Sequence, residues 1–168
     1  VEVQYYDPLI GAGIADLIRD TTGLIFMESP GSQTFEVQDV PAIVAAAKAR
    51  NVKTALDNTW ATPLNFKPLD HGVDYSVQAA TKYIVGHADA LLGTVATSKE
   101  NHEHLRRTHA MLGLCAAPDD VFLALRGLRT LPLRLKQHQS AALEMAQWLK
   151  ALSCVRRVFY PALPTDAG

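Results

Sequence analysis

The stretch Ser-Val-Gln-Ala-Ala-Thr-Lys-Tyr at residues 76–83 decides the fold, because it ends a short strand and places Lys82 just beyond it. A second strand is expected at residues 52–56, and Asp57 closes that strand 25 residues before Lys82. Strands and helices alternate along the chain, which predicts an open α/β sheet with helices on its faces. Functional residues in such sheets lie beyond the carboxyl ends of the strands, where Asp57 and Lys82 both stand.

Hydrophobic spacing and capping residues predict the individual elements. Asp7 caps a first helix that begins at Pro8, and Asp39 caps a second over residues 40–47. Further helices are expected at residues 99–112, 119–128 and 131–152, and strands at residues 24–27, 52–56, 75–79, 91–96 and 155–160.

Composition is typical of a globular protein and excludes several classes of partner. The 168 residues are 48% hydrophobic and 20% charged, with a net charge of -1, so nucleic acid and membrane surfaces are not expected partners. No apolar run approaches the roughly 20 residues of a membrane span, and no signal segment opens the chain. Cys115 and Cys154 are interpreted as reduced thiols, which favours a cytoplasmic protein.

Lys82 and Asp57 together match the needs of pyridoxal 5'-phosphate (PLP). Either residue alone would be interpreted as a solvated surface residue. PLP, however, takes a lysine for its Schiff base and a carboxylate that keeps its pyridine nitrogen protonated, so that the ring accepts electrons.

The surrounding residues carry a family resemblance. Residues 56–63 (LDNTWATP) and 74–89 (DYSVQAATKYIVGHAD) resemble the PLP-dependent enzymes of cysteine and methionine metabolism, and within them the bacterial cystathionine β-lyases. The resemblance extends over nearly the whole chain through YDPLIG at residues 6–11, ESPGS at 28–32, RGLRTL at 126–131 and YPALP at 160–164.

This resemblance implies a fold and a set of residue roles. The implied fold is the PLP-dependent transferase fold of the aspartate-aminotransferase type, truncated, with a mostly parallel sheet flanked by helices. Lys82 would be the covalent anchor and would shuttle a proton between the substrate's α-carbon and its sulfur. Asp57 would pair with the pyridinium nitrogen, and Thr81 would donate its hydroxyl to the phosphate. Trp60 either packs behind the cofactor ring or belongs to the core.

The implied activity is β-elimination of L-cystathionine to homocysteine, pyruvate and ammonia, by a homo-oligomer (dimer or tetramer) in the full-length form. The alternatives are a relative that acts at the γ-carbon or on another cysteine thioether, and a non-catalytic cofactor-binding fragment. Ala79 replaces a serine common in the wider family, and Gly31-Ser32 replaces the Asn-Pro typical of γ-acting members, so both positions favour the β-lyases.

Family members are substantially longer than this chain. The resemblance implies that residues 1–152 are part of the large PLP-binding domain, ending in a long helix, and that residues 153–168 begin the small C-terminal domain. The glycine-containing phosphate loop and the arginine that binds the substrate carboxylate would lie outside the chain.

Three other patterns are weaker. Gly11-Ala12-Gly13 lacks the third glycine of a dinucleotide fingerprint, and Asp16 stands in its place. His102, Glu103, His104 and His109 do not share one helical face, so a solvated surface is favoured over a metal site. A structural role in the turn between helices is favoured for Arg126, Arg129 and Arg134.

Overall fold

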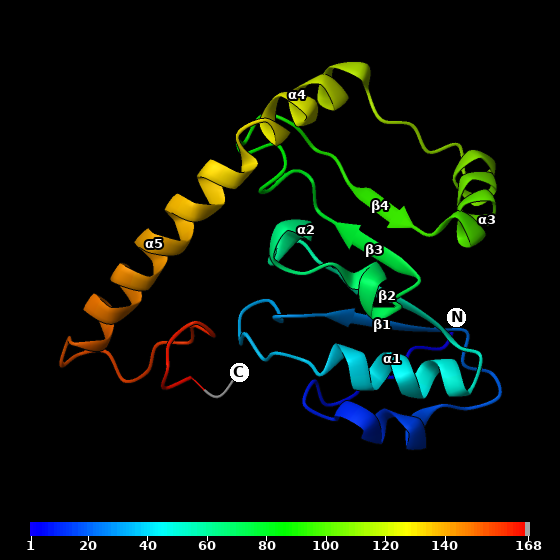
Figure 1. Cartoon of the computed structure of the whole chain (residues 1–168), viewed down its shortest axis with the longest axis horizontal. Helices are drawn as coiled ribbons and strands as arrows, with labels where there is room; N and C mark the ends of the chain where they lie inside the picture. Colours follow the sequence, from blue (N-terminus) through cyan, green and yellow to red (C-terminus); the bar gives the residue numbers. More distant parts are fainter. Residues whose placement is uncertain (167–168) are drawn as a thin grey trace.

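The computed structural model describes residues 1–166, and its centre is a four-stranded sheet (Figure 1). The strands lie in chain order as β1 (Leu24–Glu28), β2 (Lys53–Asp57), β3 (Tyr75–Gln78) and β4 (Thr94–Thr97). β1, β2 and β3 are parallel, and β4 runs antiparallel to β3. The predicted α/β class with a mostly parallel sheet is therefore confirmed.

One face of the sheet is covered by α1 (Val40–Ala49) and η1 (Gly11–Leu17), as Figure 1 shows. Asp39 caps α1 as predicted, because its carboxylate accepts a hydrogen bond from the Ala42 amide at 3.0 Å. The main core lies between these elements and the sheet, and it includes Ile14, Met27, Ile43, Val44 and Leu56.

The first helix differs from the prediction. Asp7 does cap a turn, since its carboxylate accepts from the Leu9 amide at 2.8 Å. Gly11, however, takes a left-handed φ of 51°, which breaks a helix running on from Pro8. The regular segment therefore begins at Gly11 and is a short 3-10 helix.

The connection from β2 to β3 covers residues 58–74 and is held by hydrogen bonds. It contains α2 (Thr62–Asn65) and η2 (Pro68–His71). Asn58 is fully buried where the connection leaves β2; its backbone amide donates to Val77 at 2.8 Å and its side chain donates to the Phe66 carbonyl at 3.0 Å. These bonds hold the loop after Asp57 against the end of β3.

Three helices follow the sheet: α3 (Lys99–Met111), α4 (Pro118–Leu128) and α5 (Leu131–Lys150). Figure 1 shows α5 running away from the sheet as a long arm. A second, smaller core joins α4 to the segment after β3, through Ala80, Ile84, Val85 and Ala124. The predicted positions of all three helices are confirmed within two residues, and no helix among residues 1–166 is long and apolar enough to cross a membrane.

The strand predicted at residues 155–160 is wrong. Residues 151–166 form turns and irregular backbone. The Tyr160 amide donates to the Asp166 carboxylate at 2.6 Å, and the Leu163 amide donates to the Tyr160 carbonyl at 2.9 Å. An apolar run forms a strand only where a neighbouring strand accepts its backbone hydrogen bonds, and local turns take up these groups instead.

Candidate functional site

The carboxyl ends of three parallel strands meet at one edge of the sheet. The strand register places Glu28, Asp57 and Val77 side by side at this edge. Lys82 follows β3 by four residues, in the turn that leaves the same edge. The structure therefore brings both predicted residues to the edge where open α/β sheets bind their ligands.

Asp57 is half-buried, and its carboxylate is held from one side. The backbone amide of Thr59 donates to Asp57 Oδ1 at 2.9 Å, while Oδ2 makes no hydrogen bond within residues 1–166. One carboxylate oxygen is thus fixed by the loop, and the other is free to pair with a protonated group.

The turn that carries Lys82 is defined by its backbone. The Lys82 amide donates to the Ala79 carbonyl at 3.0 Å, and the Lys82 carbonyl accepts from Gly86 at 2.8 Å. Ala80 and Val85 are fully buried and joined by a hydrogen bond of 2.9 Å, which closes the base of the turn. The Lys82 side chain is exposed, and its ammonium group makes no ion pair or hydrogen bond among the residues described.

Thr81 is placed differently from what a phosphate donor requires. Its hydroxyl donates to the Ala90 carbonyl, and its amide donates to the Leu92 carbonyl at 3.0 Å. The hydroxyl must rotate away from Ala90 before it can donate to a phosphate oxygen.

Trp60 lies outside both hydrophobic cores, with 37% of its surface exposed. Its ring meets Tyr160 edge-on, with the centroids 6.4 Å apart. The core alternative for Trp60 is therefore wrong, and the contact instead joins the loop after β2 to the segment that follows α5. Burial raises the pKa of the Tyr160 phenol, with a smaller effect from Tyr83, so the phenol stays neutral at physiological pH.

PLP can be tested against this set of groups. An exposed amine and a carboxylate with one free oxygen stand at one edge of the sheet, and they fit the aldehyde and the pyridine nitrogen of the cofactor. For the phosphate, Thr81 is the donor at this edge that the sequence singled out, and its hydroxyl is engaged. The groups present therefore fit a covalent and a ring contact with PLP, and Thr81 would supply only part of a phosphate contact.

Sequence reasoning missed Thr59. The residue is 8% exposed, and its hydroxyl accepts a hydrogen bond from the Ala79 amide at 2.7 Å. Asn58 was missed as well, although it is fully buried and its Oδ1 atom has no partner within residues 1–166. Asn and Thr directly after a strand often hydrogen-bond nearby backbone, which is the signal that could have found them.

Two of the three weaker sequence patterns, the histidine cluster and the arginines, can be compared with the structure. Among residues 1–166, no group of three or more His, Cys, Asp or Glu side chains could hold a metal ion. Arg134 donates to the carbonyls of Gly127 at 2.9 Å and Ile84 at 3.4 Å, and Arg126 pairs with Asp89 at 3.2 Å. The structural role expected for these two arginines is confirmed.

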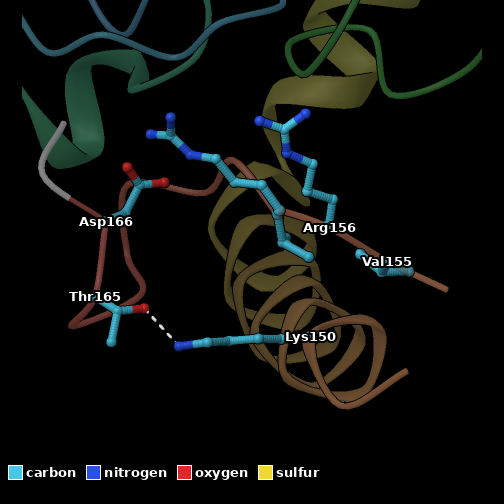
Figure 2. A pocket seen from close by; sticks show the side chains of 7 residues that line it. Lys150, Val155, Arg156, Thr165 and Asp166 are labelled. Carbon is cyan, nitrogen blue, oxygen red and sulfur yellow. Dashed lines mark hydrogen bonds between the residues drawn. The ribbon is translucent and has the colours of Figure 1, made fainter. Parts of the chain in front are cut away.

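Two cavities lie away from Asp57 and Lys82. A cavity of about 970 Å³ separates the first six residues from η1 and β1. A pocket of about 260 Å³ lies beyond the end of α5, where Lys150 donates to Thr165 at 2.6 Å and Arg156 lines the wall (Figure 2).

Comparison with curated proteins yields relatives with more than one activity. The chain is 54% identical to a Rhizobium johnstonii protein named "Putative cystathionine beta-lyase", with 98% of this chain and 42% of that protein covered. It is 46% identical to the cystathionine β-lyase MetC of Escherichia coli, over 100% of this chain and 43% of that protein. It is also 46% identical to an L-alanine/L-glutamate racemase of Wolbachia pipientis, over 97% of this chain and 40% of that protein. The chain thus spans less than half the length of these relatives.

Solved structures share the fold. A cystathionine γ-synthase from Xanthomonas oryzae, in complex with aminoacrylate and cysteine, matches with a TM-score of 0.90 and 37% identity, over 95% of this chain and 42% of that one. The family model described as "Cys/Met metabolism PLP-dependent enzyme" matches residues 1–168. The fold, the lysine and aspartate at one sheet edge, and this match together show that the chain belongs to the PLP-dependent enzymes of cysteine and methionine metabolism.

Proposed function

We propose that the full-length protein containing this chain is a carbon–sulfur lyase that converts L-cystathionine and water to homocysteine, pyruvate and ammonia. The observation that carries the proposal is the position of Asp57 and Lys82 at the carboxyl ends of adjacent parallel strands, joined by hydrogen bonds through Thr59 and Ala79. The family dependence on PLP supports it.

In this proposal the residues of the chain bind, orient and move a proton. Lys82 Nζ would anchor the cofactor covalently. Once the substrate's amino group has taken its place, the freed Lys82 amine would take the proton from the α-carbon of the substrate and deliver it to the departing sulfur. Asp57 Oδ2 would accept the hydrogen bond of the protonated ring nitrogen. Bound PLP supplies an electron-accepting ring that stabilises negative charge at the α-carbon. Trp60 lies on the loop directly after Asp57 and would pack against that ring, and Thr81 would donate to the phosphate after its hydroxyl turns away from the Ala90 carbonyl.

Two positions support β- over γ-elimination. Ala79 and the Gly31-Ser32 pair match the β-lyase pattern rather than that of γ-acting members. Two relatives named as β-lyases are 54% and 46% identical to this chain, and the γ-synthase structure described above is 37% identical. We therefore propose that the substrate is cystathionine and that the carbon–sulfur bond at its β-carbon is cleaved.

Racemisation is the second candidate, because the Wolbachia racemase is as similar to this chain as the E. coli β-lyase. Both reactions begin with removal of the α-proton, so one lysine could serve either. A racemase returns the proton to the other face of the same carbon, whereas a lyase expels the thiolate.

One experiment separates the candidates. The purified full-length protein with PLP is incubated with L-cystathionine, with L-methionine and with L-alanine in parallel. Release of homocysteine and pyruvate from cystathionine alone supports the β-lyase. D-Alanine formation without thiol release would replace it with the racemase, and turnover of methionine would replace it with a γ-acting enzyme.

The chain is proposed to be one part of a two-domain enzyme. Residues 1–152 would form part of the large PLP-binding domain and residues 153–168 would begin the small one. The chain covers 40–43% of the relatives described above, so it would be one part of such an enzyme. We propose a dimer or tetramer in the full-length form, working in the cytoplasm, where the exposed and unpaired Cys115 and Cys154 would stay reduced.

A further inference from the structure

We propose that Thr59 is a positioning residue, which holds the Asp57 carboxylate and the Lys82 turn in a fixed relation to each other. This inference rests on the roles of Asp57 and Lys82 in the proposed function.

Three hydrogen bonds carry the inference, and they connect the two residues without a gap. The Thr59 amide donates to Asp57 Oδ1 at 2.9 Å. The Thr59 hydroxyl accepts from the Ala79 amide at 2.7 Å. The Ala79 carbonyl accepts from the Lys82 amide at 3.0 Å. Thr59 thus joins the carboxylate on the β2 side to the turn on the β3 side.

The hydroxyl of Thr59 takes the place of a missing backbone acceptor. The pairing of the two strands ends where the Asn58 amide donates to the Val77 carbonyl at 2.8 Å. Beyond that point the chain after β2 turns away toward α2, so the Ala79 amide has no strand partner. A half-buried amide needs a partner, and the buried Thr59 hydroxyl provides it.

The hydrogen bonds through Thr59, called here the Thr59 bridge, matter for the chemistry because they would set the distance between the two residues that hold opposite ends of the cofactor. Asp57 would hold the ring nitrogen, and Lys82 would hold the opposite, reactive side of the cofactor. An error in the distance between them moves the proton-transferring amine relative to the substrate's α-carbon, and misplacements of about 1 Å cost on the order of 100-fold in rate.

The test compares Thr59→Val with Thr59→Ser in the full-length protein loaded with PLP. Valine keeps the shape and loses the hydroxyl, while serine keeps the hydroxyl. The exposed Thr108→Val on α3 is the matched control, because the Thr108 side chain makes no hydrogen bond among residues 1–166. We expect Thr59→Val to lower kcat about 10- to 100-fold with little change in KM, and Thr59→Ser and Thr108→Val to stay close to the wild-type protein.

A second readout does not depend on catalysis. Hydrogen exchange of the Ala79 amide is measured in the cofactor-free protein, where loss of one hydrogen bond should speed exchange about tenfold in Thr59→Val but not in Thr59→Ser. Unchanged exchange together with unchanged kcat in Thr59→Val would overturn the positioning role. A wild-type protein without lyase activity would refute the proposed function instead, and the exchange result would still decide the bridge.

Failure of the Thr59→Val variant to fold would also give an informative result, because a second variant can be tested. Thr59→Ala removes the hydroxyl without placing a methyl group against the Ala79 amide, so it replaces valine if that variant does not fold. Should both fail to fold while serine folds, the hydroxyl would be needed for the fold itself, and the specific positioning role would be rejected.

Discussion

Gly127 of α4 lies directly against Ile84: a Cβ atom added to Gly127 would come within 2.1 Å of the Ile84 carbonyl oxygen and within 2.3 Å of the Val85 carbonyl oxygen. Ile84 and Val85 belong to the turn that follows Lys82. Contact between α4 and this turn is therefore made backbone to backbone, with no room for a side chain. The position of the Lys82 turn depends on a glycine in a helix 45 residues later.

Gly127→Ala should destabilise the protein. Alanine is favoured over glycine within a helix by about 1 kcal/mol, but both carbonyls belong to the backbone and cannot move aside easily. We expect a net loss of about 1–3 kcal/mol in the free energy of unfolding, measured by urea denaturation. Gly23→Ala is the control, since a Cβ there meets nothing within 4 Å. Equal stability of the two variants would contradict the close packing.

The sequence predicted those parts of the fold that depend on local patterns. Asp39 and the apolar spacing after it predicted α1, and short apolar runs predicted β1 and β2. The carboxyl-end rule for open sheets then brought Asp57 and Lys82 to one edge. Each of these inferences needs only neighbouring residues or a general rule of topology.

The failures all depend on partners that lie far away in the chain or on one backbone angle. Residues 155–160 have the composition of a strand, but no strand in the described part of the chain pairs with them. The left-handed φ of Gly11 shortened the first helix. Thr59 was missed because its hydroxyl bonds to the amide of Ala79, which lies 20 residues away in the sequence, and no local pattern indicates such a contact.

Asp57→Asn should leave the fold intact and reduce catalysis. The asparagine side chain can still accept the Thr59 amide, but it lacks the charge that keeps the cofactor ring nitrogen protonated. In the full-length enzyme we expect turnover of cystathionine to fall at least about 100-fold, equivalent to about 2.7 kcal/mol in the barrier. Circular dichroism spectra should match the wild-type protein. A rate near that of the wild type would remove Asp57 from the mechanism.

Lys82 should be the residue that borohydride reduction labels with PLP. Peptide mapping after reduction should find the pyridoxyl group there and not on Lys48, Lys53 or Lys67. Lys53 makes a useful internal control, because its hydrogen bond to Asp74 raises the pKa of its ammonium group and keeps it protonated. Label on Lys53 or Lys67 instead of Lys82 would refute the assignment.

Asp74 should contribute a pH-dependent stability at the opposite end of the sheet. Burial alone would raise the pKa of Asp74, but hydrogen bonds from Lys53, the Thr54 amide and Asn101 outweigh burial and lower it. A carboxyl with a lowered folded pKa stabilises the fold above its unfolded pKa of about 3.9, and loses this contribution as the pH falls through the folded pKa.

Asp74→Asn should therefore lose about 1–2 kcal/mol of unfolding free energy at pH 7. Its stability should also fall less steeply than that of the wild-type protein below about pH 4. Urea denaturation between pH 7 and pH 3 measures both effects, with the exposed Asp20→Asn as the control. Parallel pH curves for Asp74→Asn and the wild-type protein would contradict the role of the Asp74 network.

The 168-residue chain by itself should bind PLP weakly at best and show no measurable lyase activity. Thr81 is the one phosphate donor identified at the site, and a single neutral hydrogen bond contributes only about 0.5–1.5 kcal/mol. The family resemblance implies that the arginine that binds the substrate carboxylate lies outside these 168 residues, so the α-carbon would lack the two hydrogen bonds that orient it toward Lys82.

The same chain should also self-associate. β1 is one of the two edge strands of the sheet, with Leu24 50% and Phe26 53% exposed, and α4 leaves Phe122 64% and Leu125 57% exposed. Analytical ultracentrifugation should therefore show species larger than 18.3 kDa. PLP titration followed by absorbance, with Lys82→Ala as the control, should show little specific binding. A monomer of this mass that cleaves cystathionine at the rate of full-length relatives would overturn the expectation, because the chain would then contain every group the reaction needs.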